Sequence, residues 1–267
     1  MSGSRASETP IVAAEIFLAM LRRDLRVARR ELPFFLLRTV LQPLMLMVVF
    51  GFLLPRMGML PKAYTATLLP GVLALAITLS AIQSIALPMV AQFGFSREIE
   101  DRLLAPIPTH LVALELVVAA TIQGILAGLF VLPCGRLIMG PIPGLALANA
   151  AQVLSVMTVG AATFSALGLF IGCAISPQQI GLMFSTIIGP MIFFGCTYYP
   201  WSALKNFPFL QKAVLINPLV YASEGMRATL VPQFPHLSIM AVLIALLFFD
   251  CLLLVLGLRQ FEKKAVT

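Results

Sequence analysis

The sequence has few charged residues, few cysteines and little polar surface of any kind. Only 11% of its 267 residues are charged and 60% are hydrophobic, whereas soluble domains are about one quarter charged and about half apolar. A mean hydropathy of +1.00 leaves too little polar surface to cover a soluble fold of this length. Charge is also scarce for a disordered chain, and glycine has no collagen-like period. The chain is therefore predicted to be an integral membrane protein.

The residues that carry catalytic or metal chemistry are sparse too. The four cysteines lie apart in apolar segments, and none belongs to a CxxC pair or a Cys/His pair with metal-ligand spacing. Cys134 and Cys196 both fall near the predicted outer face, which leaves a disulfide open, but the burial habit of free cysteine favours isolated thiols. No Gly-Lys dipeptide occurs, so there is no Walker A phosphate loop. We expect no metal, no catalytic site, no bound cofactor and no ATP hydrolysis by that route.

Long apolar runs predict an all-α fold with six transmembrane helices, because a bilayer core takes about 20 apolar residues of helix. The predicted spans lie near residues 36–54, 66–91, 110–133, 145–175, 180–199 and 236–257. The transmembrane domain then covers 36–258. It follows an N-terminal segment, 1–35, and precedes a short tail, 259–267.

The basic residues predict the orientation of these spans. Twelve of the 18 lie in the N-terminal part of the chain up to Arg38, the 92–109 connection or the tail, and six lie in the other connections. Basic residues mark the cytoplasmic side, so both termini are expected on the cytoplasmic side of the membrane. No aromatic-interleaved basic groove accompanies the net charge of +7, which argues against nucleic-acid binding.

Residues 14–32 predict an amphipathic helix that lies along the membrane surface. Leucines and other apolar residues recur at helical spacing on one side, and arginines cover the rest. The arginines are Arg22, Arg23, Arg26, Arg29 and Arg30. Such a helix places its cations near anionic lipid headgroups. It is either an orientation anchor or a docking surface for a cytoplasmic partner, and both interpretations stay open.

Acidic residues inside the spans are few, whereas small residues recur there. Glu115 and Asp250 are the acidic residues within predicted spans. Each is costly in hydrocarbon and so suggests function, although structural pairing near the membrane edge is favoured. Proton-driven transporters usually carry more such groups. The GxxxG patterns at 124–128 and 168–172 predict close helix approach.

The cytoplasmic connection between the second and third spans is densely charged. It predicts a short amphipathic helix over 96–105, stopped by the prolines at 106 and 108. The residues concerned are Arg97, Glu98, Glu100, Asp101, Arg102 and Leu103. A short helix of mixed charge suits docking onto a soluble partner, and a solvated loop is the alternative.

The outer connection 200–235 is too apolar for a solvated loop. Asn217 and Pro218 divide it into two pieces, each too short to span a bilayer. Two short re-entrant helices in the outer leaflet are predicted, and helices lying flat on the outer surface are the alternative. Glu224 and Arg227, at i and i+3, are positioned to pair and partly neutralise each other.

Several motifs together resemble those of the ABC-2 type permeases, the membrane subunits of ATP-driven exporters. The resemblance covers almost the whole chain and is closest to the branch of daunorubicin-resistance permeases and nodulation-factor exporters. It is carried by Pro70-Gly71, Glu98-x-x-x-Arg102-Leu-Leu-x-x-Pro106-x-Pro108-Thr-His110, Phe193-Phe-Gly-x-x-Tyr-Tyr-Pro200 and Asn217-Pro-Leu-x-Tyr221-x-x-Glu224-x-x-Arg227.

The resemblance implies a transporter in a bacterial inner membrane that contains two permeases, the second expected to be an identical chain. Two separate ATPase subunits would hold ATP and Mg. The resemblance also implies that the 14–32 helix is the interfacial connecting helix and that 97–104 is the coupling helix. The outer pieces would shape an exit gate. The gate residues implied are Tyr198, Tyr199, Pro200, Asn217, Pro218, Tyr221, Glu224 and Arg227.

The cargo is not specified by these motifs. Glycan exporters of the superfamily often line their path with Tyr and Trp, whereas 19 of the 24 aromatic residues here are Phe. This favours a hydrophobic or amphipathic cargo, such as a drug-like molecule or a lipid, over a lipid-linked glycan. A stand-alone ion-coupled transporter and a non-transporting membrane scaffold or sensor are the competing classes.

Overall fold

The computed structural model describes residues 10–93, 107–142, 145 and 150–266, and the described secondary structure is entirely helical. Five long α-helices dominate it: α1 (Pro10–Leu46), α3 (Tyr64–Ala91), α5 (Thr109–Met139), α6 (Ala150–Ala174) and α11 (Ile239–Val266). The shorter elements are η1 (Met47–Leu53), α2 (Leu54–Arg56), η3 (Pro177–Gln179), α7 (Ile180–Met183), η4 (Phe184–Ile188), α8 (Gly189–Phe193), η5 (Trp201–Asn206), α9 (Pro208–Ala213), η6 (Val214–Ile216) and α10 (Pro218–Leu230).

Among the described residues, five helical stretches are long and apolar enough to cross a membrane. They are Thr39–Arg56, Tyr64–Ala91, Thr109–Met139, Ala150–Ala174 and Ile239–Ala265. They coincide with the first, second, third, fourth and sixth predicted spans. Lipid cannot form hydrogen bonds with peptide groups. Such apolar segments therefore form continuous helices, in which the backbone N–H and C=O groups bond to one another.

The fifth predicted span is a shorter, irregular helix. The apolar helix Gly181–Phe193 rises about 20 Å, which is short of a hydrocarbon core of about 30 Å. Five of its residues, Phe184–Ile188, have π-helical hydrogen bonding, and Pro190 follows at the start of α8. The apolar run 180–199 overstates the helix because its last six residues form turns instead.

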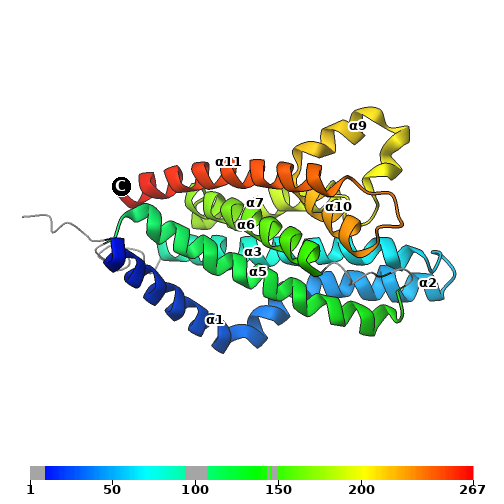
Figure 1. The fold of residues 1–267 in the computed structure, drawn as a ribbon, viewed down its shortest axis with the longest axis horizontal. Helices are drawn as coiled ribbons and strands as arrows, with labels where there is room; N and C mark the ends of the chain where they lie inside the picture. The colour runs from blue at the N-terminus through cyan, green and yellow to red at the C-terminus, as the bar shows by residue number, and fades with distance from the viewer. Residues whose placement is uncertain (1–9, 94–106, 143–144, 146–149, 267) are drawn as a thin grey trace, which may run out of the picture.

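The predicted surface helix and the first span belong to one element. Helix α1 is continuous from Pro10 to Leu46 and contains Pro33 and Pro43. Figure 1 shows its first part running obliquely away from the bundle before the chain turns back along it. Prolines inside a helix are the usual cause of such bends. The five arginines at 22, 23, 26, 29 and 30 are all exposed on this first part.

Helix α3 is the centre of the bundle. It packs against α1, α5, α6 and α10, and 78% of its membrane-candidate stretch is buried. Glycines at the two predicted GxxxG sites face it: a Cβ on Gly124 would lie 3.2 Å from the Ala81 Cβ, and one on Gly168 would lie 2.4 Å from an Ile85 methyl group. Small residues thus let α5 and α6 approach α3 closely.

The two ends of the bundle differ in content. Figure 1 places the first described residues of α1 and the C-terminus at one end of the long axis, and α2, α9 and α10 at the other. The segment 194–238, which contains η5, α9, η6 and α10, thus lies at the end opposite the termini. The four cysteines are free thiols, so Cys134 and Cys196 are not bridged.

Candidate functional site

Helix α10 contains an ion pair that is completely buried. Arg227 Nη1 lies 2.7 Å from Glu224 Oε1, and neither side chain has any solvent exposure. The spacing of three residues puts both on one face of the helix. Because removing a charge from water costs several kcal/mol per ion, a pair this deep persists only if further hydrogen bonds satisfy both groups.

Arg227 finds those bonds on backbone carbonyls of two distant segments. Its Nε donates to the Thr67 carbonyl at 3.2 Å, in the first turn of α3. Its Nη2 donates to the Cys196 carbonyl and, at 3.3 Å, to the Thr197 carbonyl. The planar guanidinium can serve three directions at once, so one side chain joins α10, α3 and the turn after α8.

Glu224 extends the same network on its other side. Its Oε1 also accepts from the Trp201 backbone N–H at 2.8 Å, at the start of η5. Its Oε2 accepts from the Leu237 backbone N–H at 3.1 Å, just before α11. We call Glu224, Arg227 and these backbone partners the Glu224–Arg227 node; it connects α3, the 194–201 turn, α10 and the approach to α11.

The turn that supplies the carbonyls depends on an unusual backbone and on a glycine. Cys196 has φ = 52°, a left-handed conformation that few non-glycine residues adopt. On α3, a Cβ at Gly71 would lie 1.9 Å from the Thr197 carbonyl oxygen. Only glycine therefore lets the turn approach α3 closely enough for Arg227 to bind both.

The remaining predicted gate residues brace the same region. Asn217 caps α10 by accepting from the Leu219 N–H at 3.0 Å, and its Nδ2 donates to the Met191 carbonyl at 2.7 Å. The Tyr198 carbonyl accepts from the Tyr64 hydroxyl at 2.8 Å. The Tyr199 hydroxyl donates to the Phe193 carbonyl at 3.1 Å.

The other three contribute shape and ring contacts. Pro218 opens α10 and Pro200 precedes η5. Tyr221 packs against Phe249 of α11, with ring centroids 6.0 Å apart. All eight predicted gate residues therefore lie in or beside one assembly, built on the 194–238 segment.

The sequence of this chain matches the profile of the ABC-2 type transporter family over residues 15–231, which is most of its length. The chain belongs to the ABC-2 type transporter family. It is also 28% identical to the inner membrane transport permease YadH of Escherichia coli K12 over 185 residues, covering 67% of this chain and 69% of that protein. YadH of Shigella flexneri gives the same figures.

The family resemblance predicted from the motifs is confirmed by these matches. As an ABC-2 permease with several apolar helices, the chain is a multi-pass transport subunit of the inner-membrane class. Membership of the family also implies association with an ABC ATPase subunit.

None of the other predicted site residues that the structure describes belongs to the Glu224–Arg227 node. The six residues of the predicted coupling helix, Arg97, Glu98, Glu100, Asp101, Arg102 and Leu103, fall outside the described residues. Glu115 is fully buried in α5, and Asp250 is half-buried in α11. Within the described part of the ABC-2 permease, no group of three or more His, Cys, Asp or Glu side chains is placed to hold a metal ion.

Sequence reasoning identified the charged members of the node but not their backbone partners. Thr67, Cys196, Thr197, Trp201 and Leu237 contribute through peptide groups, which every residue has. The one available signal was Gly71 of the Pro70-Gly71 motif, since a glycine inside a long helix often marks a close backbone approach.

Proposed function

We propose that this chain is the membrane-spanning permease subunit of an ATP-driven exporter. It forms the translocation path for a hydrophobic or amphipathic cargo, and two copies of a separate ATPase subunit supply the energy. A second permease, identical to this one, completes the path. Membership of the ABC-2 family and the lack of a Walker A loop in this sequence support the proposal.

The observation that carries the proposal is the fully buried Glu224–Arg227 node. It ties the 194–238 segment to the first turn of α3. The other end of α3, at Ala91, lies shortly before the predicted coupling residues 96–105. A helix of 28 residues spans about 40 Å, so α3 is a direct mechanical link between an ATPase-docking segment and the gate.

In this mechanism, ATP-driven closure of the ATPase subunits moves the 96–105 segments and shifts α3 as a rigid element. The node moves with α3 and carries the 194–238 segment, which opens the exit. Interfaces and packed cores switch between discrete arrangements, and a network of six hydrogen bonds from two side chains favours movement as a unit.

We further propose six crossings, with the broken helix 180–193 as the fifth, and both termini in the cytoplasm. In this arrangement the first part of α1 lies along the inner surface and its exposed arginines meet anionic headgroups. The short elements η5, α9, η6 and α10 then form the re-entrant outer gate.

The test is reconstitution with the candidate ATPase in proteoliposomes and measurement of vanadate-sensitive ATP hydrolysis. Replacing Glu98, Glu100 and Asp101 together by Ala is expected to abolish stimulation of the ATPase by the permease. The matched control replaces Glu15 and Glu262, which are exposed acids elsewhere on the chain, and retains stimulation. Unchanged assembly and turnover in the triple variant contradicts the coupling role.

A further inference from the structure

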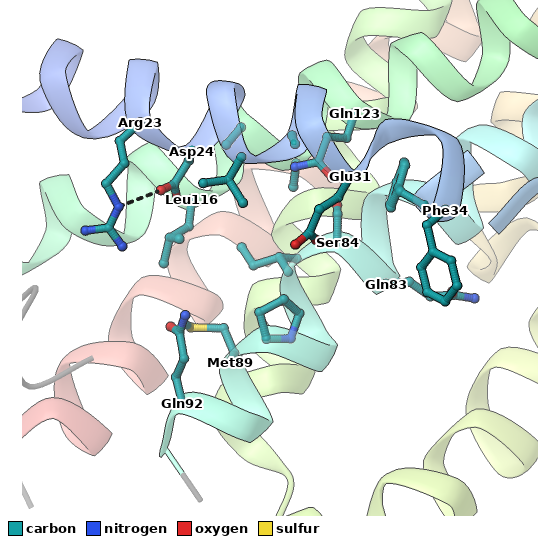
Figure 2. A pocket seen from close by; sticks show the side chains of 17 residues that line it. Arg23, Asp24, Glu31, Phe34, Gln83, Ser84, Met89, Gln92, Leu116 and Gln123 are labelled. Carbon is teal, nitrogen blue, oxygen red and sulfur yellow. Dashed lines mark ion pairs between the residues drawn. The ribbon is translucent and has the colours of Figure 1, made fainter. Parts of the chain in front are cut away.

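A cavity of about 360 Å³ lies between the first part of α1, the second half of α3 and the middle of α5. It is far from the Glu224–Arg227 node: its α3 residues lie within 83–89, toward the opposite end of that helix from Thr67, and Gln92 lies just beyond that end. Figure 2 shows Asp24 and Glu31 projecting from α1 into the space, with Ser84 and Met89 of α3 across from them and Gln83 beside Phe34. The role proposed above for the gate makes no use of this cavity.

The walls are unusually polar for helices that cross a bilayer. Gln83 comes from α3, Gln92 directly follows the last residue of α3, and Gln123 comes from α5. Amides cost free energy in hydrocarbon, and such residues face a cavity and mark a ligand pathway more often than they face lipid. The Gln92 side-chain oxygen is buried and has no hydrogen-bond partner among the described residues, so it offers an acceptor to a ligand.

The charges around the cavity leave an excess of one negative group. Arg23 Nε lies 3.7 Å from Asp24 Oδ1, which largely neutralises that carboxylate. Glu31 also lines the cavity and forms no ion pair among the described residues. A carboxylate together with three amide side chains suits a ligand group that is cationic and donates several hydrogen bonds, which is the chemistry of an ammonium.

Apart from Ser84, the rest of the lining is apolar. Met89 and Leu116 are among these apolar residues, and Phe34, with 73% of its surface exposed, lies where the cavity meets the outside. An aromatic face at the rim can hold an apolar body and also attract a nearby cation. The combination fits an amphiphile: a small polar head inside and an apolar body along Phe34.

We propose that this cavity binds the ammonium-bearing head of an amphiphile, with Glu31 as its counter-charge and Gln92 as an acceptor. The ammonium has two sources, a membrane phospholipid with an amine headgroup or an aminated cargo molecule. Occupancy by a cargo rests on the proposed transport function, whereas binding of the ammonium does not.

Binding is tested on the purified full chain in phosphatidylglycerol nanodiscs, without any ATPase. The probe is a dodecylamine that carries a diazirine in its chain; crosslinked peptides are mapped by mass spectrometry. Crosslinks are expected in 23–35 and 83–92, and excess dodecylammonium removes them while dodecyl sulfate and dodecanol do not. Equal competition by all three compounds overturns the proposal.

Two variants with matched controls test whether Glu31 and Gln92 contribute to binding of the ammonium. Glu31→Gln is expected to weaken dodecylammonium competition about fivefold, since a partly solvated ion pair gives an effect of that order. Glu15→Gln changes another exposed acid of α1 and leaves competition unchanged. Gln92→Leu weakens it about three- to tenfold, whereas Gln152→Leu, on the exposed face of α6, does not. Competition at the wild-type level in both Glu31→Gln and Gln92→Leu contradicts the site.

The source of the ammonium is separated by changing the nanodisc lipid. If a phospholipid is the natural occupant, replacing phosphatidylglycerol by phosphatidylethanolamine suppresses the crosslinks. If the cargo is the occupant, the crosslinks persist in both lipids. Either result supports the site. Because no ATPase is present, a failed transport assay leaves the binding result intact, and failed binding leaves the transport proposal intact.

Discussion

Arg227 illustrates how a single residue stabilises a charge inside an apolar bundle. Its guanidinium has no solvent exposure, yet its three nitrogens contact one carboxylate and three carbonyls. Glu224 is equally enclosed and accepts from two further N–H groups. The net contribution of such a pair to stability is small, since desolvation offsets attraction, but the loss of one member is costly. The pair therefore specifies geometry more than it adds stability.

Replacing Arg227 by Lys keeps the positive charge and removes the branched guanidinium group. We expect a loss of about 3 kcal/mol in stability, because an ammonium cannot reach the Thr67 and Thr197 carbonyls together. The measurement is the thermal unfolding midpoint of the purified chain in detergent. Arg136→Lys is the control, since Arg136 is exposed. Equal unfolding midpoints for wild type and Arg227→Lys contradict the structural role of the guanidinium group.

Gly71 is the second decisive single residue, because it admits the carbonyl that Arg227 binds. In Gly71→Ala the new methyl group would lie 1.9 Å from the Thr197 oxygen, so the turn must move away from α3. Overpacking of this kind costs about 1–3 kcal/mol. The expected result is a lower unfolding midpoint and reduced transport.

The matched control is Gly181→Ala, where nothing lies within 4 Å of the added Cβ. Alanine is the better helix former, so this variant should unfold at or slightly above the wild-type temperature. If the two alanine variants behave alike, contact with the turn is not what makes Gly71 necessary.

At the scale of elements, the most apolar candidate span is also the least buried one. Helix α11 has the highest mean hydropathy of the five candidate spans, 3.0, and only 11% of its stretch is buried; α3 has 1.9 and 78%. In a soluble protein the most apolar helix would form the core. Lipid tails are as apolar as leucine, so a lipid-facing helix can be uniformly apolar. A central helix instead carries the small and polar residues by which helices contact one another.

Helix α10 depends on its cap, which also fastens it to α8. Asn217→Ala removes the bond to the Leu219 N–H and the bond to the Met191 carbonyl. We expect a loss of about 2 kcal/mol in unfolding free energy. Asn217→Asp keeps the cap but loses the donor to Met191, so its unfolding midpoint should fall between those of wild type and Asn217→Ala. Asn206→Ala, at an exposed position, serves as the control. An Asp variant as unstable as the Ala variant would show that the cap is not the stabilising contact.

At the scale of the whole molecule, the described termini and the 194–238 segment lie at opposite ends of the bundle (Figure 1). Combined with the distribution of basic residues, this predicts that Lys205 lies on the outer side of the membrane and Lys263 on the cytoplasmic side. Both positions are exposed, so each accepts a reporter without disturbing the core.

The orientation is checked by labelling single cysteines with a membrane-impermeant maleimide on intact spheroplasts. The background lacks the four native cysteines. Lys205→Cys should react at once, and Lys263→Cys should react only after permeabilisation. The opposite pattern would invert the arrangement and move the 194–238 segment to the cytoplasmic side.

The sequence by itself determined the membrane class, the approximate positions of five long helices and the pairing of Glu224 with Arg227. These follow from composition, apolar run length and helical spacing, which are local properties. Tertiary structure decided which peptide groups satisfy that pair, because a carbonyl at Thr67 or Cys196 looks like any other in the sequence. It also decided that the fifth apolar run is a short broken helix and that α1 is one bent element. The cavity beneath α1 has the same origin: glutamines far apart in the chain share one space only after the helices have packed.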